Sequence, residues 1–234
     1  MSAFHLLLPL LFLTILFGAC SGEEDRRAED SRIPDGFGYV HKVISDARYD
    51  IRYYTEDNFV GARVDGYLAP VAILTDEALA ALKKAADELR EQGYGIVVFD
   101  TYRPQKAVDH FVRWARDPSD TLTKQKYYPE VDKADLFEKG YIAERSGHTR
   151  GSTIDLSLYD LETGEEIDMG SGFDLFGPPS HHDSELVTPE QAANRILLKE
   201  TMERHGFLPY SREWWHYRLA DEPYPETFFD FDVQ

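Results

Sequence analysis

The stretch TIDLSLY, residues 153–159, alternates between polar and apolar side chains along nearly its whole length. Such alternation is typical of a β-strand with one buried face, because successive side chains point to opposite sides of a strand. Isoleucine and leucine form the face that we expect to be buried, and Asp155 lies on the opposite face. A carboxylate on an otherwise apolar strand needs a partner, which a metal ion would supply. Exposure to solvent is the alternative.

Three helices are predicted from their boundary residues and their apolar spacing. Each begins with a residue that favours a helix N-terminus, and the first and third end at a glycine. The third also has a glutamine three residues after its threonine cap, as in a capping box. The predicted boundaries are Thr75 and Gly93 for the first helix, Arg103-Pro104 for the start of the second, with Pro104 in its first turn, and Thr188 and Gly206 for the third.

Short apolar or aromatic runs at residues 96–99 and 214–219 predict two more strands. The strands and helices do not alternate with the regular rhythm of a parallel α/β protein. We therefore predict an α+β fold in which helices pack on a mainly antiparallel sheet.

The N-terminus differs in composition from the rest of the chain. Its apolar run, residues 6–17, is shorter than the roughly 20 residues of a membrane span and has the length of a signal-peptide core. Small residues then precede Cys20, as in a bacterial lipobox, although Phe17 stands where leucine is usual and the start lacks lysine or arginine. We predict a signal peptide with lipobox at residues 1–20, lipidated at Cys20. A plain secretory signal or a weak membrane anchor is the alternative.

Residues 21–35 are charged and lack a core pattern, so we predict a flexible tether there and a folded domain at residues 36–234. We thus expect an exported protein, periplasmic or held in the cell envelope as a lipoprotein, whose only membrane contact is the lipid anchor or N-terminal segment. The chain has 25 basic and 43 acidic residues, a net charge of -18, which argues against a nucleic-acid partner. Cys20 is the only cysteine, so the domain has no disulfide and no cysteine nucleophile or metal ligand.

Two segments carry residues suited to metal chemistry. In SGHTRGSTID, residues 146–155, His148 is expected in a glycine-flanked loop ahead of Asp155. In EWWH, residues 213–216, Glu213 and His216 are three apart and would point to opposite faces of a regular strand. They reach one site only if the chain bulges there; otherwise the segment is an aromatic core strand with a surface glutamate.

Together, two histidines and one aspartate match catalytic zinc, which takes three protein ligands and leaves a fourth position for water. Glu213 beside the paired tryptophans Trp214 and Trp215 would have a raised pKa, as suits a general base. Arg103 follows a predicted strand and begins a helix, where a guanidinium could hold the oxyanion formed from a peptide carbonyl. A surface ion pair is the alternative for Arg103.

The pattern Ser-x-His-x-x-Gly-x-x-x-Asp, followed later by Glu-x-x-His, resembles the zinc D,D-peptidases. It is most similar to the D-alanyl-D-alanine dipeptidase family, the VanX-like enzymes. Supporting segments occur in order from about residue 39 to 233, among them Val64-Asp65-Gly66-Tyr67, Tyr102-Arg103-Pro104, Ser180-His181-His182 and Asp221-Glu222-Pro223-Tyr224-Pro225.

This resemblance implies one Zn²⁺ ion and hydrolysis of a small dipeptide, D-Ala-D-Ala, in cell-wall scavenging or turnover. It implies that the metal ligands are His148, Asp155 and His216, that Glu213 is base and then acid, that Arg103 stabilises the transition state, that Tyr53, Asp100 and Asp174 surround the substrate's amino end, and that Ser146 lines the pocket. Gly147 departs from the serine of the family, so we expect one contact to be lost there. The His181-His182 pair has no expected ligand role.

Two alternatives stay open. A D,D-carboxypeptidase that trims longer peptidoglycan stems would use the same zinc ligands, although carboxylates at the amino end favour a free dipeptide. A non-enzymatic exported binding module could keep the fold around a structural zinc, but such zinc normally has four protein ligands and no neighbouring base.

Overall fold

The computed structural model of the protein describes residues 33–234. The predicted signal peptide, Cys20 and most of the predicted tether lie outside the described residues and stay predictions. Within the described part, no helix is long and apolar enough to cross a membrane.

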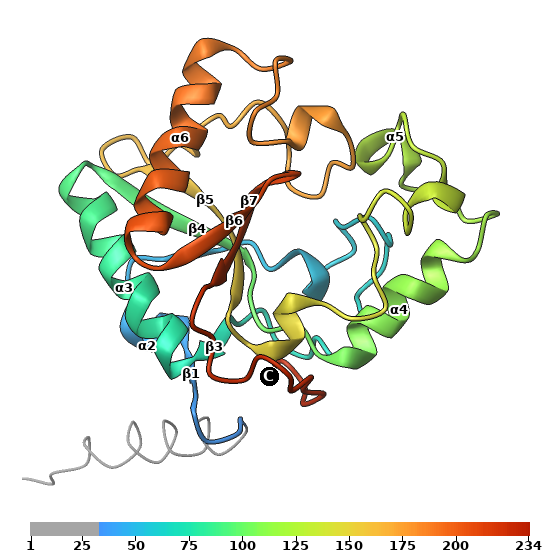
Figure 1. The fold of residues 1–234 in the computed structure, drawn as a ribbon, viewed down its shortest axis with the longest axis horizontal. Helices are drawn as coiled ribbons and strands as arrows, with labels where there is room; N and C mark the ends of the chain where they lie inside the picture. The colour runs from blue at the N-terminus through green and yellow to red at the C-terminus, as the bar shows by residue number, and fades with distance from the viewer. Residues whose placement is uncertain (1–32) are drawn as a thin grey trace, which may run out of the picture. The chain divides into compact units, whose positions relative to one another are not determined.

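A five-stranded sheet forms the centre of the domain (Figure 1). Only the short β2 runs parallel to its neighbour β4, and the other three pairings are antiparallel. In sheet order the strands are β2 (Arg48–Tyr49), β4 (Tyr94–Asp100), β5 (Thr153–Asp160), β7 (Glu213–Leu219) and β6 (Phe207–Tyr210); a separate antiparallel pair consists of β1 (Phe37–Tyr39) and β3 (Ile73–Thr75). The predicted α+β fold with a mainly antiparallel sheet is confirmed.

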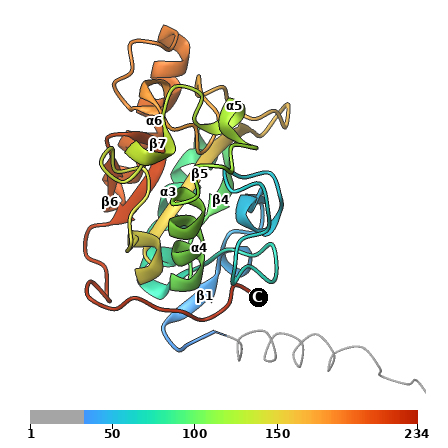
Figure 2. The ribbon, with the colours of Figure 1, turned by 90° about the vertical axis from the view of Figure 1, so that its right-hand side faces the viewer.

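The three predicted helices are present. They are α3 (Asp76–Glu91), α4 (Gln105–Ala115) and α6 (Pro189–Arg204); the shorter helical segments are α2 (Val40–Val43), α5 (Lys124–Tyr127) and the 3-10 turns η1 (Arg52–Tyr54), η2 (Lys133–Asp135), η3 (Gly147–Arg150) and η4 (Pro178–Ser180). Helices α3 and α6 lie on one side of the sheet and α4 on the other (Figures 1 and 2).

The start of α4 differs from the prediction that Pro104 lies in the first turn. Pro104 has φ -64° but ψ 154°, so it is the extended cap residue and the helix begins at Gln105. The proline carbonyl still accepts the first helical hydrogen bonds, from the amides of Ala107 and Val108. The proline ring fixes φ alone, which leaves ψ free to be set by the chain that enters from β4.

Strand β5 is buried on both faces, which the alternating pattern did not predict. Thr153, Asp155 and Ser157 on the polar face are each at most 2% exposed. Because α4 and its neighbouring loops cover this face while α3 lies across the other, Asp155 is enclosed by protein, and the alternative of a solvent-exposed carboxylate does not hold.

The predicted bulge occurs where β7 pairs with β6. Pro209 is opposite Tyr217, but the next β6 residue, Tyr210, is opposite Glu213. One step along β6 therefore spans four residues of β7, and this irregularity brings Glu213 and His216 to the same site despite their odd spacing.

A buried arginine of α6 organises the loop between β5 and α6. Arg195 is 1% exposed and has no carboxylate partner among the described residues. Its guanidinium donates to three backbone carbonyls, those of Met169, Pro179 and His181, and burial lowers its pKa to about 10. The loop held in this way includes Asp174 and the His181-His182 pair, which joins no group of metal-ligand residues in the described part of the chain.

The C-terminal segment fastens the start of α4 to the turn that carries His148. The amide of Gln105 donates to the carbonyl of Phe229 at 3.0 Å, and the amide of Phe229 donates to the carbonyl of Thr149 at 2.9 Å. The chain then ends beside β1, where the hydroxyl of Tyr39 donates to the carbonyl of Gln234 at 2.8 Å (Figure 2).

The capping box of α6 yields a prediction for stability. Thr188 accepts a hydrogen bond from the amide of Gln191, whose side chain accepts one from the amide of Thr188. Thr188→Ala should lower the free energy of unfolding by about 1 kcal/mol, measured by urea denaturation. Thr188→Ser keeps the hydroxyl and should lose much less; an equal loss in both variants would contradict a capping role.

Candidate active site

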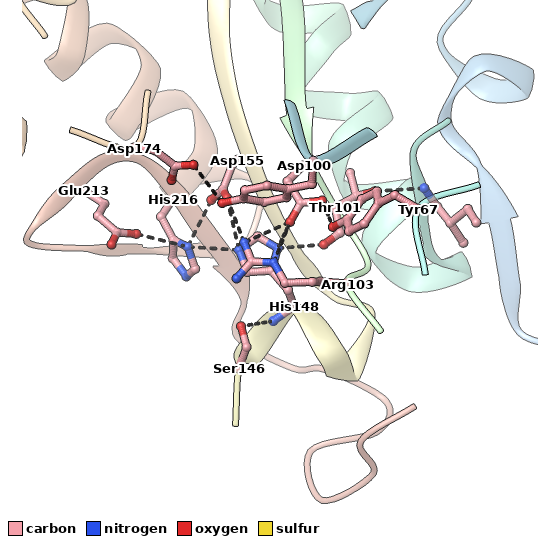
Figure 3. Close-up of polar contacts among 12 residues, drawn as sticks. Tyr67, Asp100, Thr101, Arg103, Ser146, His148, Asp155, Asp174, Glu213 and His216 are labelled. Atoms are coloured by element: carbon pink, nitrogen blue, oxygen red, sulfur yellow. Dashed lines mark hydrogen bonds and ion pairs between the residues drawn. The ribbon is translucent and has the colours of Figure 1, made fainter. Parts of the chain in front are cut away.

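Three metal-ligating side chains meet at one end of the sheet (Figure 3). One ligand atom from each of His148, Asp155 and His216 can be chosen so that all lie within 4.8 Å of one another. Strand β5 carries Asp155, and β7 places His216 directly opposite it in the strand register. The 3-10 turn η3, just before β5, supplies His148.

The orientation of His148 is fixed by hydrogen bonds from outside the cluster. Its Nδ1 lies 2.6 Å from the carbonyl oxygen of Thr101, which can only accept, so Nδ1 carries the proton. The unprotonated Nε2 then faces the cluster, 3.3 Å from Asp155 Oδ2 and 3.2 Å from His216 Nδ1. A backbone carbonyl behind a histidine is a common way to hold that ring as a metal ligand.

The turn before β5 depends on one glycine. Gly151 has φ +82°, a left-handed conformation that closes η3, and a Cβ there would lie 2.3 Å from the ring of Phe37. Ser146 begins the turn, where its Oγ accepts from the amide of His148 at 3.2 Å. Ser146 therefore shapes the loop as well as lining the cavity.

The Asp155 carboxylate has too few hydrogen-bond donors around it, as is expected of a metal ligand. It is 2% exposed, and its Oδ1, 3.0 Å from His216 Nδ1, has no hydrogen-bond partner of suitable geometry. Burial works to raise the pKa of this carboxyl, but the two histidines outweigh it and hold the pKa below its usual range. An ionised carboxylate with an unsatisfied oxygen beside a bare imidazole nitrogen fits a divalent cation such as zinc.

Glu213 stands beside this cluster at the wall of the cavity. Its carboxylate lies 3.6 Å from His216 Nδ1, and its side chain is 16% exposed. Burial raises the pKa of Glu213 to about 7, against the opposing effect of His216. A carboxyl group with a pKa near neutrality can both take and return a proton at neutral pH.

Arg103 is held from several directions. Its Nε and Nη2 each lie 2.9 Å from Asp100 Oδ2, and its Nη2 lies 3.6 Å from Asp155 Oδ2. The guanidinium also lies 5.0 Å from the ring centre of Tyr53 and 5.1 Å from that of Phe111. These contacts fix the direction in which its remaining N–H groups point.

Asp174 forms a second acidic wall. It accepts a hydrogen bond from the hydroxyl of Tyr53 at 2.9 Å and is 6% exposed. Burial, and then the nearby charge of Asp155, raise the pKa of Asp174 well above its usual range. Its φ of 60° is uncommon for a residue other than glycine, and such conformations concentrate at functional sites.

The cavity enclosed by these residues has a volume of about 330 Å³, which suits a small ligand. Eight of the nine predicted residues of the domain site line it, namely Tyr53, Arg103, Ser146, His148, Asp155, Asp174, Glu213 and His216. Asp100 does not line the cavity. It is 1% exposed and lies behind Arg103, where its other oxygen accepts from the hydroxyl of Tyr67 at 2.6 Å.

Gly147 is one of the residues that line the cavity, and the contact expected to be lost there stays a prediction. A Cβ at this position would lie 3.0 Å from Thr153 Oγ1 and 3.6 Å from Arg150 Nη2. The loss of a side chain at residue 147 therefore changes the packing between η3 and the start of β5, where Thr153 Oγ1 is buried without a hydrogen-bond partner.

Several residues at the site escaped the sequence analysis. Tyr67 occurs in a segment noted for its resemblance alone, and its hydrogen bond to Asp100 depends on a long loop. Phe111 lies on α4, where apolar helical spacing alone does not indicate a contact with Arg103. Arg145 and Tyr210 also line the cavity, and no local pattern distinguishes them from surface residues.

Comparisons with known proteins identify the family of the chain. A family model described as D-ala-D-ala dipeptidase matches residues 35–234. D-alanyl-D-alanine dipeptidases of Streptomyces coelicolor and Enterococcus faecalis are each 48% identical to this chain, over 84% and 85% of it respectively and over 98% of each relative. A third, from Escherichia coli, is 32% identical over 76% of this chain and 81% of that protein.

A solved structure of VanYB in complex with D-Alanine-D-Alanine is more distant, with 16% identity, a TM-score of 0.40 and coverage of 66% of this chain and 75% of that one. With the family model matched over nearly all described residues and relatives close to half identical along their full length, the chain belongs to the D-Ala-D-Ala dipeptidase family.

Proposed function

We propose that this protein hydrolyses the free dipeptide D-Ala-D-Ala, using one zinc ion held by His148, Asp155 and His216. The observation that carries the proposal is the convergence of these three ligand groups beside Glu213 in a cavity of about 330 Å³. The relatives named D-alanyl-D-alanine dipeptidase indicate the substrate.

Zinc bound by these ligands would polarise the scissile carbonyl and make water more acidic. Glu213 takes the proton of the attacking water and then delivers it to the amine that leaves, a role that its pKa of about 7 supports. Arg103 donates hydrogen bonds to the carbonyl oxygen as negative charge develops there. Asp100 and the rings of Tyr53 and Phe111 keep the guanidinium in place during this step.

The acidic wall at Asp174 and Tyr53 favours a substrate with a free amino end. An ammonium group would place its positive charge beside the buried Asp174 carboxyl. A longer peptide has a neutral amide at the same position, so the acidic groups would lose their water without gaining a cation. The cavity thus favours a dipeptidase over a D,D-carboxypeptidase.

Hydrolysis of D-Ala-D-Ala and its N-acetylated form by the zinc-loaded protein tests this preference. We expect kcat/KM for the free dipeptide to be at least about 100-fold higher than for the N-acetylated form, because acetylation removes the positive charge that would lie beside Asp174. Comparable or faster cleavage of the blocked form would favour the carboxypeptidase. No cleavage of either, with zinc bound, would favour the binding module.

The assigned roles separate metal binding from turnover. Glu213→Gln should keep one zinc per chain, measured by atomic emission, while kcat falls by about 10²–10⁴ because the base is lost. His216→Ala should lose zinc as well as activity. His205→Ala is the matched control, since His205 pairs with Glu88 away from the cavity and should keep both. Substantial turnover by Glu213→Gln would rule out its role as base.

We also propose that the protein is an exported lipoprotein of the cell envelope, modified at Cys20, where it would recover dipeptide from cell-wall turnover. The short apolar run and the small residues before Cys20 support this location. Bacteria fed labelled palmitate should label the unsubstituted chain but not Cys20→Ala, as seen after membrane fractionation. If the unsubstituted protein is unlabelled and is released from the membrane fraction, a plain secretory signal is indicated instead.

A further inference from the structure

We propose that Arg145 binds the carboxylate of the dipeptide and thereby determines specificity at the C-terminal end of the substrate. The inference rests on the proposed function, because a free dipeptide carries an ammonium at one end and a carboxylate at the other. The acidic wall accounts for the ammonium. The carboxylate still needs a cation in the same cavity, since a buried charge without a partner is costly.

The described residues that line the cavity include two arginines, Arg103 and Arg145. Arg103 is already engaged by Asp100 and Asp155 and lies close to the rings of Tyr53 and Phe111. A substrate carboxylate at Arg103 would also approach the carboxylates of Asp100 and Asp155. Repulsion between like charges therefore disfavours that side of the cavity for the C-terminal end.

Arg145 also lines the cavity and directly precedes Ser146 in the chain. Figure 3 shows Ser146 separated by His148 from Asp100, Asp155 and Asp174. A carboxylate placed beside residues 145 and 146 would keep its distance from all three acids. The two ends of the dipeptide would then lie on opposite sides of the metal ligands, as hydrolysis of the bond between them requires.

The guanidinium of Arg145 is available for this contact. Arg145 is exposed and makes no ion pair with any described residue, because its acidic neighbour Glu144 pairs with Arg116 at 2.8 Å instead. Its guanidinium lies over the ring of Phe228, 4.7 Å from the centroid. A guanidinium that packs with its flat face on a ring keeps its N–H edge free, and such an edge matches a carboxylate with two parallel hydrogen bonds.

The test combines a substitution in the protein with a change in the substrate, and it uses the full-length zinc-loaded chain. D-Ala-D-Ala is compared with D-Ala-D-alaninamide, which lacks the terminal charge, in the unsubstituted protein and in Arg145→Gln. For the acid, we expect KM to rise by about 10- to 100-fold in Arg145→Gln with a much smaller change in kcat. For the amide, KM should be nearly the same in both proteins. Arg145→Lys keeps the charge but lacks the planar edge, so its KM for the acid should lie between those of the unsubstituted protein and Arg145→Gln.

Binding is measured separately by calorimetry in a Glu213→Gln background, where the dipeptide is not consumed. Arg113→Gln is the matched control, an exposed arginine of α4 that pairs with Asp65 and does not line the cavity, and it should leave KM unchanged for both substrates. If Arg145→Gln weakens the binding of the acid and of the amide equally, or changes the binding of neither, the assignment to Arg145 is wrong. The dipeptidase function still stands in that case. If the unsubstituted protein hydrolyses neither the dipeptide nor its N-acetylated form, the proposed function fails and the assignment fails with it.

Discussion

Asp155 is buried where β5 pairs with β7, and its charge has to be compensated inside the protein. The strand register places His216 opposite it, and the η3 turn adds His148, so two imidazoles surround one carboxylate. Even so, one carboxylate oxygen has no hydrogen-bond partner of suitable geometry. This incomplete compensation is what makes the end of the sheet suitable for a divalent cation, and the neighbouring turn, bulge and helix start all serve to hold the same three side chains in place.

Two buried arginines show different ways of stabilising a cation away from water. Arg103 is paired with carboxylates and aromatic rings, so its charge is compensated and its orientation is fixed toward the cavity. Arg195 is surrounded by backbone carbonyls and contacts no carboxylate among the described residues. Burial of its charge therefore lowers the pKa of Arg195. The first arrangement leaves a charged group at the reaction centre. The second ties a loop to α6, and through that loop it supports the position of Asp174.

The sequence predicted the parts of the fold that depend on local rules. Alternation gave the strand at β5, cap residues gave α3 and α6, and the odd spacing of Glu213 and His216 required the bulge in β7. The contacts of Arg195, Tyr67 and Arg145 could not be foreseen, because each depends on the path of a long loop. The location of Asp100 behind Arg103 could not be predicted either. Sequence spacing indicates that a residue lies near a site, but it does not show whether another side chain separates that residue from the cavity.

The distribution of charge in the cavity bears on substrate length as well as identity. In the proposed binding mode, Asp174, which is hydrogen-bonded to Tyr53, would contact a free amino group, and Arg145 in the same cavity would contact a free carboxylate. A substrate that satisfies both must have its two charges separated by about the length of two residues, with its single peptide bond between them beside Glu213. A longer chain can satisfy one wall at most, and the other then loses its water without gaining an opposite charge. In this binding mode, selection for a dipeptide would follow from the two charged ends of the substrate, and it would not require a lid or a tightly closed cavity.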